Sequence, residues 1–502
     1  MKIAWNNGVP FSELQGDVLV QIVSELQIKS DGLISEWDSK ISKLGTLGLF
    51  EGKLQQIYIL PLDKDPGFPV AILVGRGDRV LSSDDLRLMF ANIARAAVKL
   101  KVEKLVIPIP SDISEWTKGV NLAVTAQAFS EGLILGGYVR QHYKQDQSPY
   151  GGLSSIMFYR ENQLEESEVQ QWTTGLERGQ AFGDAALIAR NLTNIPGNML
   201  VPADLAVSAV HIAEKYGFPV EVLDEREIVA KGMGGLWAVG KGSSNPPRMI
   251  VIRYQGTDQW ENAVGLVGKG ITFDTGGVSL KRAPGMENMI SDMGGAAAVL
   301  GVAEALGRLR PRINVVMVIP SAENMLSANA FKPGDVITSL SGRTIEVLNT
   351  DAEGRIVLAD ALTYAREWGA ERIIDIATLT GAVLSTLGDV ATGVVTNDES
   401  FLKEFTEASL RSGEKIWPLP AYPEFKEMLK SEVADIRNAT GGYGAAITAG
   451  LFIGTFAEEK PWIHLDIAGT AFLAKERGVH SKGATGVMVR TILEWLISQA
   501  EK

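Results

Sequence analysis

Apolar runs of strand length alternate with helix-forming stretches along the C-terminal part of this chain, and this alternation restricts the fold more than any other feature. The runs include NAVGLVG, INVVMVIP, RIIDIATL and WIHLDIA, and the helical stretches between them include GGAAAVLGVAEALGRL. Strands that are apolar on both faces are typical of a mainly parallel sheet covered by helices on both sides. We therefore expect an α/β fold here and regard this region as the candidate catalytic domain.

The beginning of the chain shows the same alternation on a smaller scale. Strand-like runs occur at VLVQIV, QQIYILPL, VAILVG and KLVIPIP, and a helical apolar period over residues 84–100 follows Ser82 and Ser83, which can cap a helix. A chain of 502 residues exceeds the usual single core. We predict a smaller N-terminal α/β domain over residues 1–165 and a larger catalytic α/β domain with a mainly parallel central sheet over residues 166–502.

The charge and cysteine content narrow the possible partners. The chain carries 48 Lys+Arg against 60 Asp+Glu, and its formal net charge of -12 opposes attraction to nucleic acids and anionic membranes. It has no cysteine, so disulfides and thiolate metal sites are excluded within this sequence. The start has no signal-peptide pattern, and the apolar part of residues 438–457 is too short to span a bilayer. We expect a cytoplasmic protein with no membrane partner.

Several familiar catalytic motifs fail at a required position. GKGITF has Phe273 where a dinucleotide-binding loop needs its third glycine, and GVSLK lacks the second glycine of a serine nucleophile elbow. The four histidines, His142, His211, His464 and His480, lie far apart, so we assign them structural roles. Any hydrolytic metal site must therefore use oxygen ligands, with an amine as an addition, which suits Zn, Mn, Mg or Co.

The strongest cluster of oxygen ligands is NTDAEGR, residues 349–355, between the apolar run TIEVL and a helical stretch. At such a strand-to-helix junction the helix packs on the sheet with its N-terminus at the strand's carboxyl end, where open α/β sheets bind ligands. In an extended segment Asp351, Glu353 and Arg355 project to the same side. A solvated surface loop would explain the motif if it stood alone.

Two further segments supply carboxylates and lysines. VGKGITFDTGG, residues 267–277, ends an apolar strand with Lys269, Asp274 and two glycines that allow close backbone approach, and Lys281 follows. Asp292 opens the Ala/Gly-rich helical stretch, whose smooth surface suits a buried position against the sheet. A buried carboxylate needs a partner or a metal ion. These residues therefore favour a metal site together with NTDAEGR.

The combination of GKGITFDTGG, Lys281, SDMGGAAAV and NTDAEGR closely resembles the leucine aminopeptidase family of cytosolic metallopeptidases. The resemblance continues through NLTNIPGNMLVP, ATLTGA and HLDIAGTA, and it covers the C-terminal two thirds of the chain. It implies a two-metal aminopeptidase that removes N-terminal residues from peptides with a free α-amine during intracellular peptide turnover. It also implies a broad specificity that favours Leu-like residues, and a homohexamer.

The same resemblance implies a role for each site residue. Two divalent metal ions, Zn or Mn with Mg or Co as alternatives, would share Asp274 and Glu353, with Asp351 on one ion and Lys269 and Asp292 on the other. Lys281 and Arg355 match the catalytic lysine and arginine, and the arginine would hold a bicarbonate that acts as general base. The implied substrate-binding wall consists of Met289, Asn349, Thr378, Leu379 and Gly381.

The two lysines need opposite charge states for these roles. A lysine ligand must be neutral although its reference pKa is about 10.4, and both metal charge and burial favour the neutral form of Lys269. Lys281 should stay charged and stabilise the developing oxyanion. Two alternatives remain at this point: a DNA-binding regulatory protein on the same fold, which the net charge disfavours, and a catalytically inactive structural relative, against which the complete ligand set argues.

Overall fold

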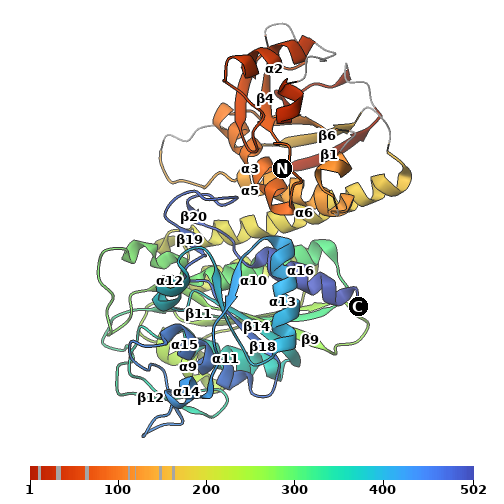
Figure 1. Cartoon of the computed structure of the whole chain (residues 1–502). Coiled ribbons are helices and arrows are strands. Elements are labelled where there is room, and N and C mark those ends of the chain that lie inside the picture. Colours follow the sequence, from red (N-terminus) through yellow and green to blue (C-terminus); the bar gives the residue numbers. More distant parts are fainter. Residues whose placement is uncertain are drawn as a thin grey trace. The chain divides into compact units, whose positions relative to one another are not determined.

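The computed structural model describes residues 1–8, 13–29, 36–62, 67–110, 113–118, 120–145, 150–160 and 164–502. The chain divides into two compact units (Figure 1): unit 1 comprises Met1–Asp184 with Arg477–Ser481, and unit 2 comprises Ala185–Glu476 with Lys482–Lys502. The division falls inside helix α6, Glu166–Thr193. The domain boundary near residue 165 coincides with the start of this helix and stays a prediction.

Unit 1 contains a six-stranded sheet in the order β1-β6-β5-β2-β4-β3. Its strands are β1 Lys2–Asn7, β2 Val18–Val23, β3 Ile57–Pro61, β4 Val70–Gly75, β5 Lys104–Pro108 and β6 Ser155–Arg160. All neighbours pair in parallel except β3, which is antiparallel to β4. The runs VLVQIV and VAILVG coincide with β2 and β4, whose apolar side chains are buried on both faces.

Besides the first part of α6, the helices of unit 1 are α1 Glu25–Lys29, α2 Glu36–Thr46, α3 Ser83–Leu100, α4 Ile113–Trp116 and α5 Leu122–Gly136. The start of α3 follows from a local signal in the sequence. The side chain of Ser82 accepts a hydrogen bond from the backbone N–H of Asp85, and the Asp85 side chain accepts one from the backbone N–H of Ser82. This reciprocal capping satisfies two donors that the first turn of α3 leaves free. The predicted cap is confirmed.

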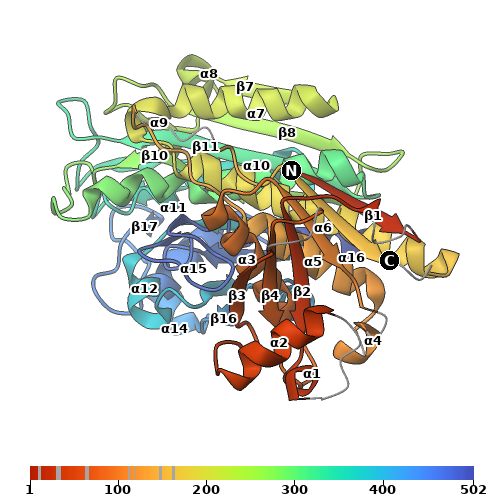
Figure 2. The same cartoon turned by 90° about the horizontal axis from the view of Figure 1, so that it is seen from above.

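Unit 2 is built on a nine-stranded sheet in the order β16-β15-β18-β14-β9-β11-β8-β7, with β10 paired to β11. Its strands are β7 Val220–Leu223, β8 Arg248–Gln255, β9 Ala263–Gly268, β10 Gly270–Asp274, β11 Asn314–Asn324, β14 Ala370–Ala377, β15 Thr392–Thr396, β16 Ile416–Pro418 and β18 Trp462–Asp466. The central strands β18, β14, β9 and β11 are parallel. Strand β8, which lies between β11 and β7 (Figure 2), runs antiparallel to both. The predicted α/β fold with a mainly parallel central sheet is confirmed.

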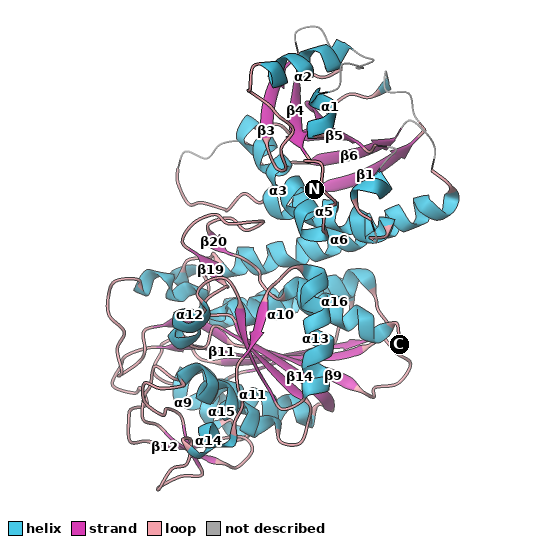
Figure 3. Ribbon diagram, viewed as in Figure 1, coloured by secondary structure: helices cyan, strands magenta, loops and turns pink. Residues whose placement is uncertain are grey.

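Helices cover both faces of this sheet (Figure 3). One face carries α7 Pro202–Tyr216, α10 Gly294–Leu309 and α16 Val489–Ala500, and the other carries α9 Gly234–Gly240, α11 Gly354–Glu367 and α15 Ala445–Ala457. The remaining helices are α8 Glu225–Ala230, α12 Gly381–Leu387, α13 Glu399–Ser412 and α14 Pro423–Glu427, with 3₁₀ turns η2 Gly197–Met199 and η3 Met286–Met293. Helices α10 and α11 both contact β9 and β14, so these central strands are covered on both sides.

One described segment, Met286–Leu309, is long and apolar enough to cross a membrane by length and composition. It consists of η3 and α10, and 89% of its apolar window is buried inside the structure. Helix α10 packs on β9 and β14. Its apolar composition is therefore that of a helix in the protein core.

The strand that precedes NTDAEGR lies outside the central sheet. It is β13, Thr344–Glu346, which pairs with β12, Val336–Thr338, and β17, Ile436–Arg437. Only Ile345 of β13 is fully buried, as expected of a strand with one solvated face. The expectation that this strand leads from the central sheet into the site is therefore wrong. The last pair of strands, β19 Phe472–Leu473 and β20 Gly483–Ala484, forms a separate two-stranded sheet.

Candidate metal and catalytic site

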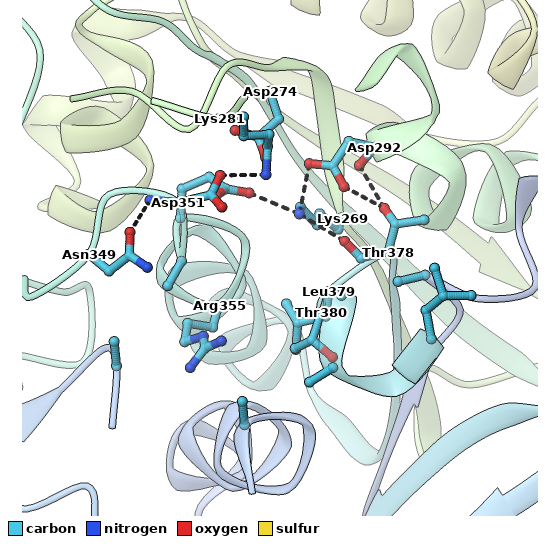
Figure 4. Close-up of a pocket in the computed structure, with 18 of the residues that line it drawn as sticks. Lys269, Asp274, Lys281, Asp292, Asn349, Asp351, Arg355, Thr378, Leu379 and Thr380 are labelled. Atoms are coloured by element: carbon cyan, nitrogen blue, oxygen red, sulfur yellow. Dashed lines mark hydrogen bonds and ion pairs between the residues drawn. The ribbon is translucent and has the colours of Figure 1, made fainter. Parts of the chain in front are cut away.

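A cavity of about 410 Å³ in unit 2 brings together every residue that the sequence predicted for the site. Figure 4 shows this cavity with many of these residues labelled. Its lining also includes Ser291, Ala352, Thr380, Ala382, Leu384, Ala439, Thr440, Gly441, Ala445, Thr448 and Ala468. None of the four histidines lines it. His464 is fully buried and its Nδ1 lies 2.6 Å from Oδ1 of Asp375.

The cavity lies where several central strands end. Lys269 directly follows β9, Asp274 is the last residue of β10, and Thr378 directly follows β14. Asp292 lies in η3 just before α10, and Glu353 immediately precedes α11. The carboxyl ends of parallel strands are the usual ligand-binding edge of such a sheet.

Three carboxylates form the centre of the site. Asp274, Asp351 and Glu353 each offer an oxygen, and these oxygens all lie within 4.8 Å of one another. Burial, followed by the charge of Asp274, raises the pKa of both Glu353 and Asp351. Burial also raises the pKa of Asp292. So many buried carboxylates are stable as anions only when cations lie among them.

Two lysines supply positive charge in this cluster. Lys269 Nζ lies 2.8 Å from Asp292 Oδ2 and 2.9 Å from Glu353 Oε1. Lys281 Nζ lies 2.8 Å from Asp274 Oδ2 and also pairs with Asp351. Burial opposes the charged form of both lysines, but the surrounding carboxylates outweigh it and raise both pKa values. With these carboxylates alone Lys269 is protonated, so it can become a ligand only where a metal ion displaces its proton.

Two glycines allow the chain to approach this closely. At Gly276, where φ is +85°, an added Cβ would lie 2.9 Å from Oδ1 of Asp351. At Gly354 an added Cβ would lie 2.6 Å from Cε of Lys269. A side chain at Gly354 would therefore displace the Lys269 stem, and one at Gly276 would also require a strained backbone.

The backbone of NTDAEGR differs from the extended segment that we expected. Glu353 has φ of -77° and ψ of -35°, and Arg355 lies in the first turn of α11. The backbone N–H of Asp351 donates to Oδ1 of Asn349 at 2.9 Å, which turns the chain. The period-two argument is therefore wrong, because a turn and a helix start, not a strand, bring Asp351, Glu353 and Arg355 to the cavity.

Arg355 is a buried cation with unused hydrogen-bonding capacity. Its Nη1 donates to the backbone carbonyl of Asn438 at 2.8 Å, while its Nε is buried without a hydrogen-bond partner. Burial lowers the pKa of Arg355 to about 10, so the guanidinium stays charged at neutral pH. Among the residues that the structure describes, no carboxylate forms an ion pair with it. A buried guanidinium that lines a cavity in this way fits an anion.

Sequence reasoning missed two buried residues that organise the site. Asn324 Nδ2 donates to Asp274 Oδ1 at 2.8 Å. Asp466 accepts hydrogen bonds from Thr380 Oγ1 at 2.7 Å and from the backbone N–H of Leu379 at 3.1 Å. Both residues are polar and stand at the end of an apolar strand, and this signal could have identified them.

Both parts of the chain match models of one protein family. Residues 22–147 match the N-terminal domain of the cytosol aminopeptidase family, and residues 187–493 match the catalytic domain of the same family. Members of this family are two-metal enzymes.

Named relatives agree with the family models. A probable cytosol aminopeptidase of Bacillus subtilis (strain 168) is 44% identical over 468 residues, which are 93% of this chain and 89% of the relative. A probable cytosol aminopeptidase of Alkaliphilus metalliredigens (strain QYMF) is 45% identical over 424 residues, which are 84% of each protein.

Solved structures agree as well. The bottromycin maturation enzyme BotP in complex with Mn superposes with a TM-score of 0.83 at 32% identity, covering 97% of this chain and 100% of that one. A tomato leucine aminopeptidase mutant superposes with a TM-score of 0.86 at 33% identity, covering 99% and 96%. The matched ranges, the identities and the shared fold lead to one conclusion. The chain belongs to the cytosol aminopeptidase family and is a metal-dependent aminopeptidase.

Proposed function

We propose that this aminopeptidase removes the N-terminal residue from peptides with a free α-amine, with a broad specificity that favours Leu-like residues, and that it acts in intracellular peptide turnover. One observation carries the proposal: four carboxylates and two lysines from separate segments line one cavity. Apolar side chains of Met289, Leu379 and Leu384 line the same cavity. Such side chains suit an aliphatic substrate residue.

The proposed cofactors are two divalent metal ions, Zn or Mn, with Mg or Co as alternatives. The donor set fits them because it consists of carboxylate oxygens and one amine. We assign Asp274 and Glu353 to both ions, Asp351 to one, and Lys269 and Asp292 to the other. When bound, the ions would polarise the scissile carbonyl and make water a better nucleophile at neutral pH.

Lys281 and Arg355 are the proposed catalytic residues. Lys281 is held among carboxylates that raise its pKa, so its ammonium group is charged and can stabilise the oxyanion that develops on the substrate carbonyl. A guanidinium cannot accept a proton at neutral pH. Arg355 would instead hold a bicarbonate, whose oxygen accepts the proton of the attacking water.

The substrate-binding wall is proposed from the residues beside the ligands. It comprises Met289, Asn349, Thr378, Leu379 and Gly381. An added Cβ at Gly381 would meet no atom within 4 Å. This open space beside the wall supports a role in accommodating the substrate side chain.

The larger organisation is also a proposal. We propose residues 166–502 as the catalytic domain and residues 1–165 as the N-terminal domain, a homohexameric assembly and a cytoplasmic location. The names of the relatives support the location. The resemblance to the leucine aminopeptidase family supports the assembly.

A substrate panel tests the proposed reaction. Aminoacyl amides are compared after loading with Mn²⁺ or Zn²⁺, and Leu-amide is compared with N-acetyl-Leu-amide. We expect cleavage of the free amine and little cleavage of the acetylated compound. Equal kcat/KM for these two compounds would overturn the requirement for a free α-amine, and equal rates for all side chains would overturn the preference for Leu-like residues.

A further inference from the structure

We infer that Asn324 is a positioning residue of the metal centre, whose side-chain amide orients the two carboxylates that we propose as shared ligands, Asp274 and Glu353. The inference rests on that proposed ligand set. It adds a residue that contacts neither substrate nor, in this assignment, a metal ion.

Asn324 is fixed in place by the sheet. It is the last residue of β11 and pairs in register with Asp274, the last residue of the parallel strand β10. Its side chain is fully buried. Its backbone carbonyl accepts hydrogen bonds from both the N–H and the hydroxyl of Thr275, at 3.0 and 2.7 Å. The side chain therefore has little freedom to move away from the carboxylates.

The side-chain amide of Asn324 lies within hydrogen-bond distance of three acceptors in two segments of the chain. Nδ2 lies 2.8 Å from Asp274 Oδ1, 3.0 Å from the backbone carbonyl of Thr350 and 3.5 Å from Glu353 Oε2. The opposite orientation of the amide would turn Oδ1 toward three acceptors. The network therefore determines which end of the amide faces the site.

In this orientation, the two oxygens of each carboxylate have different partners. Asn324 holds Oδ1 of Asp274 and Oε2 of Glu353, while Oδ2 of Asp274 faces Lys281 and Oε1 of Glu353 faces Lys269. Hydrogen bonds of this kind set the direction in which a ligating carboxylate presents its free oxygen. Losing the amide should therefore change both proposed shared ligands together.

The carbonyl end of the same amide is left without a partner. Oδ1 of Asn324 is buried and makes no hydrogen bond. A buried unpaired acceptor is unfavourable and calls for an explanation. The hydrogen bonds that Nδ2 donates in the carboxylate cluster explain why the amide keeps this orientation although Oδ1 is left unpaired.

The chain offers a matched control on the same strand. Asn314, the first residue of β11, is 2% exposed, and its Nδ2 donates to the backbone carbonyls of Gln259 and Glu261, both at 2.8 Å. Asn314→Leu and Asn324→Leu thus remove the same buried group from opposite ends of one strand. Of these two residues, only Asn324 forms hydrogen bonds with proposed metal ligands.

The test measures Mn²⁺ binding to the full chain by competition with a chelator, without any substrate. We expect the dissociation constant to rise about 10- to 100-fold in Asn324→Leu, the usual range for lost partners of metal ligands, and to change little in Asn314→Leu. Wild-type Mn²⁺ affinity in a folded Asn324→Leu variant would overturn the inference. So would an equal loss in Asn314→Leu, because the cause would then be the strand.

Asp274→Ala separates this inference from the proposed ligand set. If Asp274→Ala binds Mn²⁺ like the wild type, the ligand set itself is wrong. If Asp274→Ala loses Mn²⁺ and Asn324→Leu does not, only the role of Asn324 is wrong. Should Asn324→Leu fail to fold, the smaller Asn324→Ser variant is judged by the same criterion.

Discussion

The hydroxyl of Thr378 donates a hydrogen bond to the carboxylate of Asp292, with 2.7 Å between Oγ1 and Oδ1. The same hydroxyl also lies 3.1 Å from the backbone carbonyl of Asp292. Sequence reasoning placed Thr378 in the substrate-binding wall and Asp292 among the metal ligands. Because this hydrogen bond links Thr378 to Asp292, a substitution of Thr378 should also alter the metal site.

Thr378→Val tests this link, because it keeps the shape of the side chain and removes the hydroxyl. We expect weaker Mn²⁺ binding, so that activity falls at limiting Mn²⁺ and partly recovers at saturating Mn²⁺. Thr378→Ser, which retains the hydroxyl, is the control. A loss of activity that does not depend on Mn²⁺ concentration would instead place Thr378 in substrate binding alone.

Asp274→Ala and Glu353→Ala should each remove metal and activity together, since both carboxylates are proposed to serve both ions. The double variant should then be scarcely worse than either single variant, as is usual for residues that act as one unit. Metal content by elemental analysis and kcat are measured on the same samples. Near-normal turnover with full metal content in either single variant would contradict the assignment.

Arg355→Ala should leave the metals bound, because Arg355 is not a proposed ligand. We expect kcat to fall about 10²- to 10⁴-fold, the usual range for a lost acid–base group, together with a loss of activation by added bicarbonate. Arg355→Lys, which keeps the charge but not the planar fork, should recover only part of the activity. Normal activity of bicarbonate-depleted wild-type enzyme would remove bicarbonate from the mechanism.

The chelated protein should become less stable as the pH rises. Burial raises the pKa values of Glu353, Asp292 and Asp351 in the folded state. The protonated carboxyl groups therefore contribute to the free energy of unfolding, and this contribution is fully present below their unfolded pKa values, about 4. It is lost as the pH rises through the folded values. The melting temperature of the chelated enzyme should therefore fall from pH 5 to pH 8, which is roughly the range between the unfolded and the folded pKa values.

The slope of that pH profile should be shallower in Glu353→Gln, which cannot titrate, and in the metal-loaded wild type, where metal charge favours the ionised carboxylates. Thermal unfolding of the chelated wild type, the chelated variant and the loaded wild type at the same pH values provides the comparison. A flat profile for the chelated wild type would show that protonation of these carboxylates does not contribute to its stability.

Long apolar elements were predictable from the sequence, and short ones were not. The helical stretch GGAAAVLGVAEALGRL coincides with α10, because its apolar character matches its burial in the core. Strand β13 has three residues and one buried side chain, so its sequence carries no sign of which sheet it joins. Local periodicity identifies an element but does not specify its neighbours.

The same limit applies to the site. The predicted residues belong to segments with strong motifs, and all of them line the cavity. Asn324 and Asp466 act through hydrogen bonds to residues 50 and 86 positions away along the chain. Their position at the ends of apolar strands marks both residues as candidates, but no local pattern specifies the distant residues that they contact. The extended interpretation of residues 351–355 failed because the start of α11 at Gly354 replaced strand geometry with helical geometry.

The open space beside Gly381 makes one member of the wall a suitable position for redesigning selectivity. The side chains of nearby Thr378 and Thr380 already take part in hydrogen bonds, Thr378 with Asp292 and Thr380 with Asp466. At Gly381, which begins α12, an added Cβ meets no atom within 4 Å, and a helix tolerates alanine well. A graded series of side chains at this position would narrow the pocket step by step while leaving the carboxylate cluster intact, so substrate choice could be engineered separately from metal binding.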